Sequence, residues 1–130
     1  MGMYTEIFFR AELRTDVPTK VIDLIRAWIT NEVPDNLPDH PLFKCDRWGT
    51  LLNGGSAYFP TMVSPVFARG GFSHEWELSF NSSLKNYDGE IQQFFDWINP
   101  YLRAVPGEFI GYHLYEADEV PTLMLKKESN

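Results

Sequence analysis

Residues 5–29 are echoed at residues 74–98, and this echo constrains the fold more than any other feature of the sequence. Adding 69 to a position in the first segment gives its partner in the second. The identical pairs are Glu6/Glu75, Ile22/Ile91, Trp28/Trp97 and Ile29/Ile98. In both segments apolar residues first alternate, as on one face of a strand, and then recur every three or four residues, as on a buried helical stripe. A strand-then-helix unit that occurs twice predicts a pseudo-symmetric α+β sandwich.

The other patterns along the chain complete this sandwich. They predict strands at about 4–13, 47–52, 57–63, 72–81 and 108–116, a hairpin turn at 53–56 and a short edge strand at 121–125. Helices are expected at about 18–31 and 88–99, and the tail 126–130 is expected to fray. Without one hairpin strand this is the order of a ferredoxin-like fold, in which two helices cover one face of a mainly antiparallel sheet. At 130 residues, the chain is expected to form one such domain.

Large apolar side chains also fall on the sheet face that the helices are expected to leave uncovered. By alternation these are Phe8, Phe109 and Tyr115. Their neighbours Ile110, Tyr112 and Leu114 are expected to point into the core. A contiguous apolar patch of more than a few hundred Å² seldom stays exposed on a monomer. Either a proline-rich loop at residues 34–48 or a partner is therefore expected to cover this face.

A second copy of the chain is one such partner. A homodimer is expected to form through the uncovered face or through an edge strand of the sheet. Proline cannot donate a hydrogen bond to a neighbouring strand, so Pro60, Pro65 and Pro121 should blunt the edges. The uncovered face is therefore favoured.

Composition excludes several classes of function. With 18 acidic and 11 basic residues the formal charge is −7, and the cations are scattered, so direct binding of nucleic acid is disfavoured. No run approaches the roughly 20 apolar residues that a membrane-spanning helix needs, and residues 1–6 lack the features of a signal peptide. The single cysteine, Cys45, rules out a disulfide within the chain and indicates a reducing cytoplasm.

Metal binding and nucleophilic catalysis find little support. His40 and Cys45 are five residues apart, but zinc sites use close-spaced ligand pairs and no second pair exists. Cys45 could act with His40 or His113 as a nucleophile, yet Asp46 beside it disfavours the reactive thiolate. We therefore expect no catalytic residue, metal or cofactor, and a non-enzymatic protein rather than an enzyme.

Two segments combine aromatic and polar side chains outside the expected helices and strands. The candidate interaction residues are Asp39, His40, Arg47 and Trp48 from the proline-rich loop 34–48, and Asn86 and Tyr87 from residues 83–89. Rigid loops that carry such side chains are typical of binding sites. The alternative is a structural clasp, in which Arg47 bridges to a carboxylate and Trp48 starts a strand inside the core. The sequence leaves both open.

Three strings carry a resemblance to known proteins: LPDHPLFKCDRW (37–48), SSLKNYDGEIQQFFDWINPY (82–101) and FIGYHLYEADEVPTL (109–123). They resemble a family of small proteins encoded by tailed phages, prophages and actinobacterial genomes. The resemblance spans most of the chain, is weaker through residues 54–72, and carries no activity. It implies a phage or prophage accessory setting in the host cytoplasm, where small acidic proteins often bind a host component.

These observations lead to two functional expectations. The first is a non-enzymatic interaction module that binds a host protein. The second is a small-molecule-binding or enzymatic ferredoxin-like domain, with a pocket under loop 34–48 lined by Asp39, His40 and Arg47. A deep pocket there would favour the second, and a flat aromatic surface would favour the first.

Overall fold

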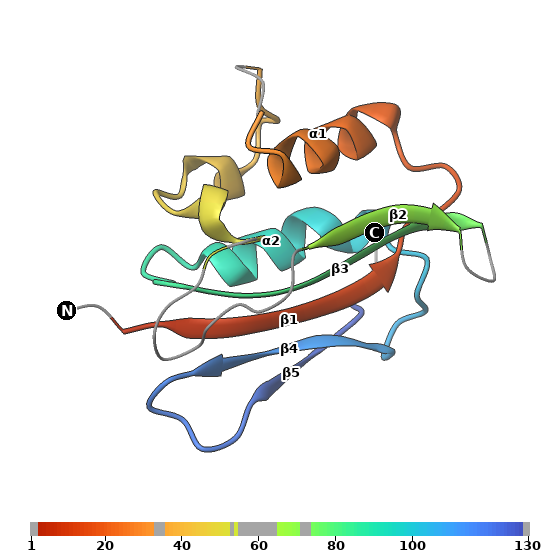
Figure 1. The fold of residues 1–130 in the computed structure, drawn as a ribbon. Coiled ribbons are helices and arrows are strands. Elements are labelled where there is room, and N and C mark those ends of the chain that lie inside the picture. Colours follow the sequence, from red (N-terminus) through yellow and green to blue (C-terminus); the bar gives the residue numbers. More distant parts are fainter. Residues whose placement is uncertain (1–2, 33–35, 53, 55–64, 71–73, 129–130) are drawn as a thin grey trace.

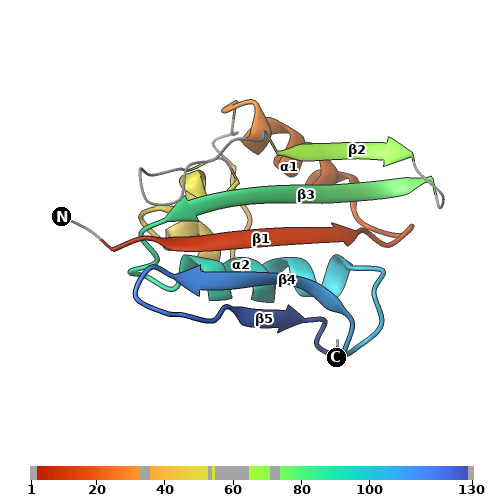
Figure 2. The same ribbon diagram turned by 60° about the horizontal axis from the view of Figure 1, so that its bottom comes forward.

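A five-stranded antiparallel sheet carries two helices on one face (Figures 1 and 2). The computed structural model describes residues 3–32, 36–52, 54, 65–70 and 74–128. The strands are β1 (Thr5–Glu12), β2 (Val66–Gly70), β3 (Glu75–Leu84), β4 (Phe109–Tyr115) and β5 (Thr122–Leu125), in the spatial order β2-β3-β1-β4-β5. The helices are α1 (Thr19–Ile29) and α2 (Glu90–Ile98), with 3-10 turns η1 (Pro41–Lys44), η2 (Trp48–Thr50) and η3 (Asn99–Tyr101).

The α+β prediction is confirmed. The ferredoxin-like assignment is not, because this five-strand order departs from the four-strand pattern.

The two echoed segments form the centre of the fold. β1 is followed by α1 and β3 by α2, and β1 and β3 are antiparallel neighbours. Arg10 pairs with Ser79, which is its own equivalent in the echo because 10 + 69 = 79. The equivalent Trp28 and Trp97 meet across the helix pair, with ring centroids 6.4 Å apart. These relations fit a two-fold arrangement about the β1–β3 pair, and superposition of the two units stays a prediction.

Both helices bury the stripes that their sequences show. α1 buries Val21, Leu24, Ile25 and Trp28, and α2 buries Ile91, Phe94, Phe95, Trp97 and Ile98. Asn31, at a positive φ of 59°, follows the end of α1, where a left-handed residue commonly stops a helix. Gly89, at φ 75°, precedes α2, and Asn86 accepts the Ile91 backbone N–H at 2.9 Å. Among the described residues, no helix is both long and apolar enough to cross a membrane.

The segment 47–52 is not the strand that the sequence predicts. Trp48–Thr50 forms the 3-10 turn η2 instead, and Leu51 and Leu52 that follow are fully buried. The apolar spacing that suggests a strand therefore comes from side chains that fill the core beside the helices. The other expected hairpin strand, 57–63, and most of the turn 53–56 lie outside the described residues.

The strand predicted at 72–81 is shifted along the chain. β3 starts at Glu75 and continues to Leu84, whose side chain is buried, as is that of Ser82. His74 precedes the strand, is exposed, and has a positive φ of 62°. The first residues of the tail are anchored and not frayed, because the Lys126 N–H donates to the carbonyl of Glu108 at 2.8 Å, whereas residues 129–130 lie outside the described residues.

A β-bulge in β4 reverses the expected orientation of several side chains. The pairing of β4 with β5 shifts register between Phe109 and Gly111. From there on, Tyr112 lies opposite Phe8 and Tyr115 lies opposite the buried Thr5. Paired residues of antiparallel strands point to the same face. Tyr112 therefore lies on the uncovered face and Tyr115 on the helix side, the reverse of the prediction.

Candidate functional site on the open sheet face

An apolar stripe crosses the sheet face that the helices leave uncovered. Register places its members on that face, and we call them the open-face stripe: Phe8, Phe109, Tyr112, Leu114, Leu123 and Leu125. The Phe8 and Tyr112 rings stack, with centroids 5.7 Å apart and planes 9° apart. Phe109, Leu123 and Leu125 are 54%, 61% and 45% exposed. Exposed apolar groups that gather in this way mark interaction sites more often than scattered ones do.

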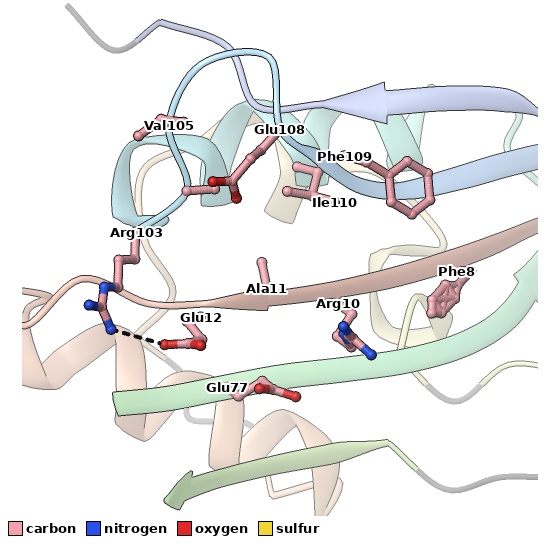
Figure 3. A pocket seen from close by; sticks show the side chains of 11 residues that line it. Phe8, Arg10, Ala11, Glu12, Glu77, Arg103, Val105, Glu108, Phe109 and Ile110 are labelled. Atoms are coloured by element: carbon pink, nitrogen blue, oxygen red, sulfur yellow. Dashed lines mark hydrogen bonds and ion pairs between the residues drawn. The ribbon is translucent and has the colours of Figure 1, made fainter. Parts of the chain in front are cut away.

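A cavity of about 770 Å³ opens beside the stripe (Figure 3). It exists because the β1–β4 ladder ends at Phe9 and Gly111, whereas β1 continues to Glu12. The chain returns to β1 only at Leu13, which bridges to Leu102. Between these points the two segments separate, and Phe8, Val105 and Phe109 line the resulting hollow together with charged side chains.

Carboxylates outnumber cations around this cavity. Glu12, Glu77 and Glu108 line it, against Arg10 and Arg103. The Arg103 guanidinium is already engaged, because its Nη1 lies 3.2 Å from Glu12 Oε2. The site therefore combines apolar surface with a surplus of negative charge.

The carboxylate of Glu6 lies along the stripe itself, because Glu6 is opposite Leu114. Burial, followed by the charge of Glu6 and its hydrogen bond, raises the pKa of the Tyr112 hydroxyl. Tyr112 therefore stays a neutral hydrogen-bonding group at physiological pH. Glu6 also accepts a hydrogen bond from Asn81 Nδ2 at 2.9 Å.

The loop that the sequence offers as an interaction surface is tied to the start of α2. The Glu90 carboxylate is fully buried and accepts the backbone N–H groups of Arg47 and Asp88, both at 3.1 Å. The Asp88 side chain accepts the Asp46 N–H at 3.0 Å. Trp48 packs edge-on against Trp28, with ring centroids 5.2 Å apart. These contacts hold this part of the loop against α2, as the clasp alternative expects. They do so through the Arg47 backbone N–H and not its side chain, and Trp48 lies in the turn η2 and not in a strand.

The structure separates the candidate interaction residues into two groups. His40 Nδ1 accepts the Leu42 N–H at 3.1 Å and so caps η1, while Asp39 reaches out to Lys44 at 3.6 Å. The other group lies where Arg47 stacks over the Tyr87 ring, 5.0 Å from its centroid. Tyr87 is 58% exposed, and its neighbour Asn86 is used in capping α2. That the six residues form one interaction surface stays a prediction.

Cys45 and the histidines are not arranged for catalysis or metal binding. The Cys45 thiol is buried and donates to the carbonyls of Pro41 and Asp88, at 3.5 and 3.7 Å. Burial raises its pKa, and the carboxylates of Glu90, Asp88 and Asp46 raise it further, so the thiolate is disfavoured. In the part of the chain that the structure describes, no group of three His, Cys, Asp or Glu side chains could hold a metal.

A second cavity, of about 760 Å³, lies beside Leu37 and Pro38 of the proline-rich loop. Val21, Leu24 and Trp97 of the two helices supply much of its wall. Asp39, His40 and Arg47 line neither this cavity nor the one beside the open-face stripe. The pocket near this loop is therefore an apolar one between helices, without the polar residues that the second functional expectation names.

Part of the open-face stripe was accessible to sequence reasoning and part was not. Phe8 and Phe109 follow from alternation. Leu123 and Leu125 were also within reach, because they alternate in the strand expected at 121–125. Tyr112 was hidden by the bulge at Gly111, which alternation does not reveal.

Comparisons with protein-family models, curated proteins and solved structures found no match. The resemblance to phage and prophage proteins stays a prediction.

Proposed function

We propose that this protein is a non-enzymatic interaction module, and that a protein partner binds on its open-face stripe. The observation that carries this proposal is the exposure of Phe109, Leu123 and Leu125 on a face that neither helix covers. Removing apolar surface from water is worth about 25 cal/mol per Å². A partner that covers these side chains therefore gains binding energy that isolated exposed residues do not offer.

The charges around the stripe define the partner's chemistry. Glu12, Glu77 and Glu108 exceed the nearby cations, and the chain as a whole carries a formal charge of −7. A segment that combines apolar side chains with Lys or Arg matches both features. Opposite charges of this kind speed association and weaken as salt rises, because ions screen them over about 10 Å at 0.1 M.

The setting and the finer fold assignment belong to the same proposal. The resemblance to phage and prophage proteins supports a host protein as the partner, and the lone buried cysteine supports a cytoplasmic location. The two strand–helix units about the β1–β3 pair support a ferredoxin-like sandwich to which β5 adds one edge strand.

The test uses a short synthetic peptide in which Leu and Lys alternate, with fluorescence anisotropy as the readout. We expect wild-type protein to bind it, and Phe109→Ser to weaken binding by about tenfold, as loss of an anchor side chain does. Tyr87→Ser is the matched control, since Tyr87 is 58% exposed, against 54% for Phe109, but lies beside Arg47. A Leu–Glu peptide should not bind.

Two results would reject the proposal. One is the absence of binding to wild-type protein at low salt. The other is loss of binding in Tyr87→Ser with full binding in Phe109→Ser, which would move the site to the loop 83–89 beside Arg47.

A small-molecule site is the second candidate, and the apolar cavity beside Leu37 and Pro38 favours it. Ala27 lines this cavity, so Ala27→Phe should fill it. Binding of a fluorescent apolar dye that Ala27→Phe abolishes and Phe109→Ser leaves intact would support this candidate. Equal dye binding by both variants would reject it.

A further inference from the structure

β5 is an edge strand that offers backbone groups to another chain. It is the last strand of the sheet on its side, and no described segment lies beyond it (Figure 2). The Lys126 N–H donates to Glu108 and the Lys126 carbonyl accepts from Gly107, both at 2.8 Å. Lys126 therefore turns its backbone groups toward the β4 side. Because these groups alternate along a strand, those of Leu123 and Leu125 point away from β4.

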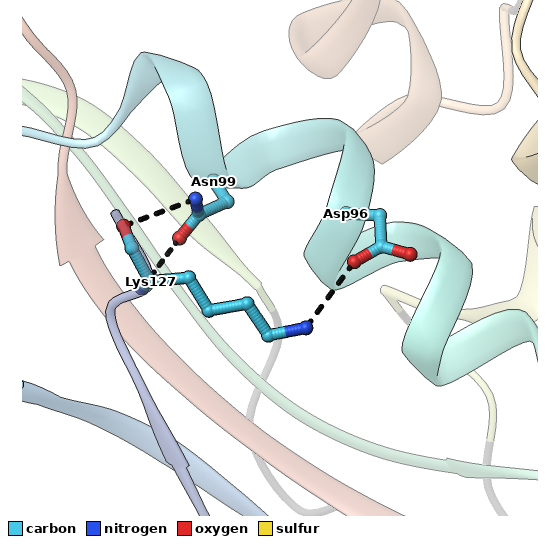
Figure 4. Close-up of polar contacts among 3 residues, drawn as sticks. All are labelled: Asp96, Asn99 and Lys127. Atoms are coloured by element: carbon cyan, nitrogen blue, oxygen red, sulfur yellow. Dashed lines mark hydrogen bonds and ion pairs between the residues drawn. The ribbon is translucent and has the colours of Figure 1, made fainter. Parts of the chain in front are cut away.

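Both ends of this edge are closed. Pro121 directly precedes β5 and has no N–H to donate. At the other end, the Asn99 side chain takes both backbone groups of Lys127: Oδ1 accepts the N–H at 3.0 Å, and Nδ2 donates to the carbonyl at 3.3 Å (Figure 4). Pro121 lies just outside β5, so it removes no hydrogen-bond donor from the strand itself. The accessible segment is centred on Leu123.

The charges on either side of this segment are self-complementary. Glu119 is exposed before β5, and Lys127, whose side chain is 62% exposed, follows it. When two copies of β5 run antiparallel with Leu123 opposite Leu123, positions 119 and 127 fall in register, because 119 + 127 = 123 + 123 = 246. This brings Glu119 of each copy toward Lys127 of the other, whose Nζ lies 3.5 Å from Asp96 Oδ1 in its own chain. In this register, Leu123 exchanges two hydrogen bonds with its counterpart, and Leu125 donates to the carbonyl of Pro121. A parallel copy would set Glu119 against Glu119.

We propose that the protein forms a two-fold dimer in which β5 pairs antiparallel with β5 of a second copy. The two five-stranded sheets then continue into one another. Leu123 and Leu125 belong to the open-face stripe, so the stripes of both copies join across the new strand pair. The dimer does not depend on the proposed partner, because its contacts lie at the edge and not on the face.

The register gives a direct cross-linking test. Residues opposite one another in a hydrogen-bonded pair have Cα atoms about 5.5 Å apart, within the range of a disulfide. Cys45 is the only cysteine and is buried, so Leu123→Cys adds the one exposed thiol. Under mild oxidation we expect most of this variant to become a covalent dimer. Thr122→Cys is the control, since Thr122 is exposed in the same strand but lies opposite Met124 in this register.

Light scattering of the untreated proteins completes the test. Wild type should have twice the 15.1 kDa chain mass at tens of micromolar, and Phe109→Ser should also be dimeric. A wild-type monomer without cross-linking at residue 123 would overturn the proposal, as would equal cross-linking at 122 and 123. A dimer that Phe109→Ser dissociates would assign association to the face instead. Because no peptide is present, failure of this dimer leaves the proposed partner site untouched, and the reverse also holds.

Discussion

The buried carboxylate of Glu90 accepts the backbone N–H of Arg47, which joins α2 to a loop 43 residues earlier in the chain. The same carboxylate accepts the Asp88 N–H, so one side chain both shapes the start of the helix and holds the loop. The loop contributes Leu42, which is fully buried. This clasp explains why a segment rich in proline is part of the core and not only a connection.

Replacing Glu90 tests the clasp. Glu90→Gln keeps the shape of the side chain but turns an N–H group toward backbone donors, so we expect it to lower the free energy of unfolding by about 1–3 kcal/mol. Asp96→Asn is the control, because Asp96 is an exposed carboxylate on the same helix. Urea denaturation measures both. Equal stability of the two variants would contradict a structural role for Glu90.

His40 and Asp39 are neighbours in the loop with different expected effects. His40 accepts the Leu42 N–H, so His40→Ala should lose a cap and destabilise the protein by about 0.5–2 kcal/mol. Asp39 has a 98% exposed side chain, and Asp39→Ala should leave the melting temperature unchanged. Thermal unfolding followed by circular dichroism separates the two. A stable His40→Ala variant that no longer binds its partner would restore the view that this loop is an interaction surface.

Cys45 should be slow to react with alkylating reagents. Its thiol is 9% exposed, and burial together with nearby carboxylates raises its pKa above the ordinary 9.0. Because the thiolate is the reactive form, iodoacetamide at neutral pH should modify folded protein far more slowly than urea-unfolded protein. Mass spectrometry gives both rates. Comparable rates in the two states would show that the thiol is accessible in the folded protein.

The dependence of stability on pH should carry a contribution from His113. Burial lowers the pKa of this side chain below its ordinary 6.5, and the nearby Asp118 opposes the shift only in part. The unfolded chain therefore binds a proton more readily, so the free energy of unfolding falls as pH decreases below 6.5 and is unaffected by this group at higher pH. His113→Gln should flatten that decrease. Denaturation curves at several pH values give the free energy of unfolding of both proteins. If this free energy falls equally with decreasing pH in the two proteins, the assignment to His113 is contradicted.

Sequence reasoning succeeded where a periodic pattern was long and failed where a single residue changed the pattern. β1 and both helices followed from apolar periodicity. The segment 47–52 was misassigned because a 3-10 turn that buries its neighbours has the same composition as a short strand. The bulge at Gly111 reversed Tyr112 and Tyr115, since one extra residue inverts every later side chain.

Neither the charged cavity nor the clasp at Glu90 could be predicted from the sequence. Arg10 and Arg103 line one cavity because the β1–β4 ladder ends early, and no local pattern records where a ladder ends. Likewise, Arg47, whose N–H the buried Glu90 carboxylate accepts, lies in a loop 43 residues earlier, and no local pattern records such a contact. Contacts between distant segments determined both features.

Gly111 restricts the substitutions that this chain can accept. A Cβ atom there would overlap the Phe8 carbonyl oxygen, so no larger residue fits without moving β4 away from β1. Position 111 also sets the phase that turns Tyr112 outward beside Phe8. Loss of this glycine would therefore both move β4 and change the face on which Tyr112 lies. Variants could drift at Phe109 or Leu123 to acquire new partners, while residue 111 would remain closed to such drift.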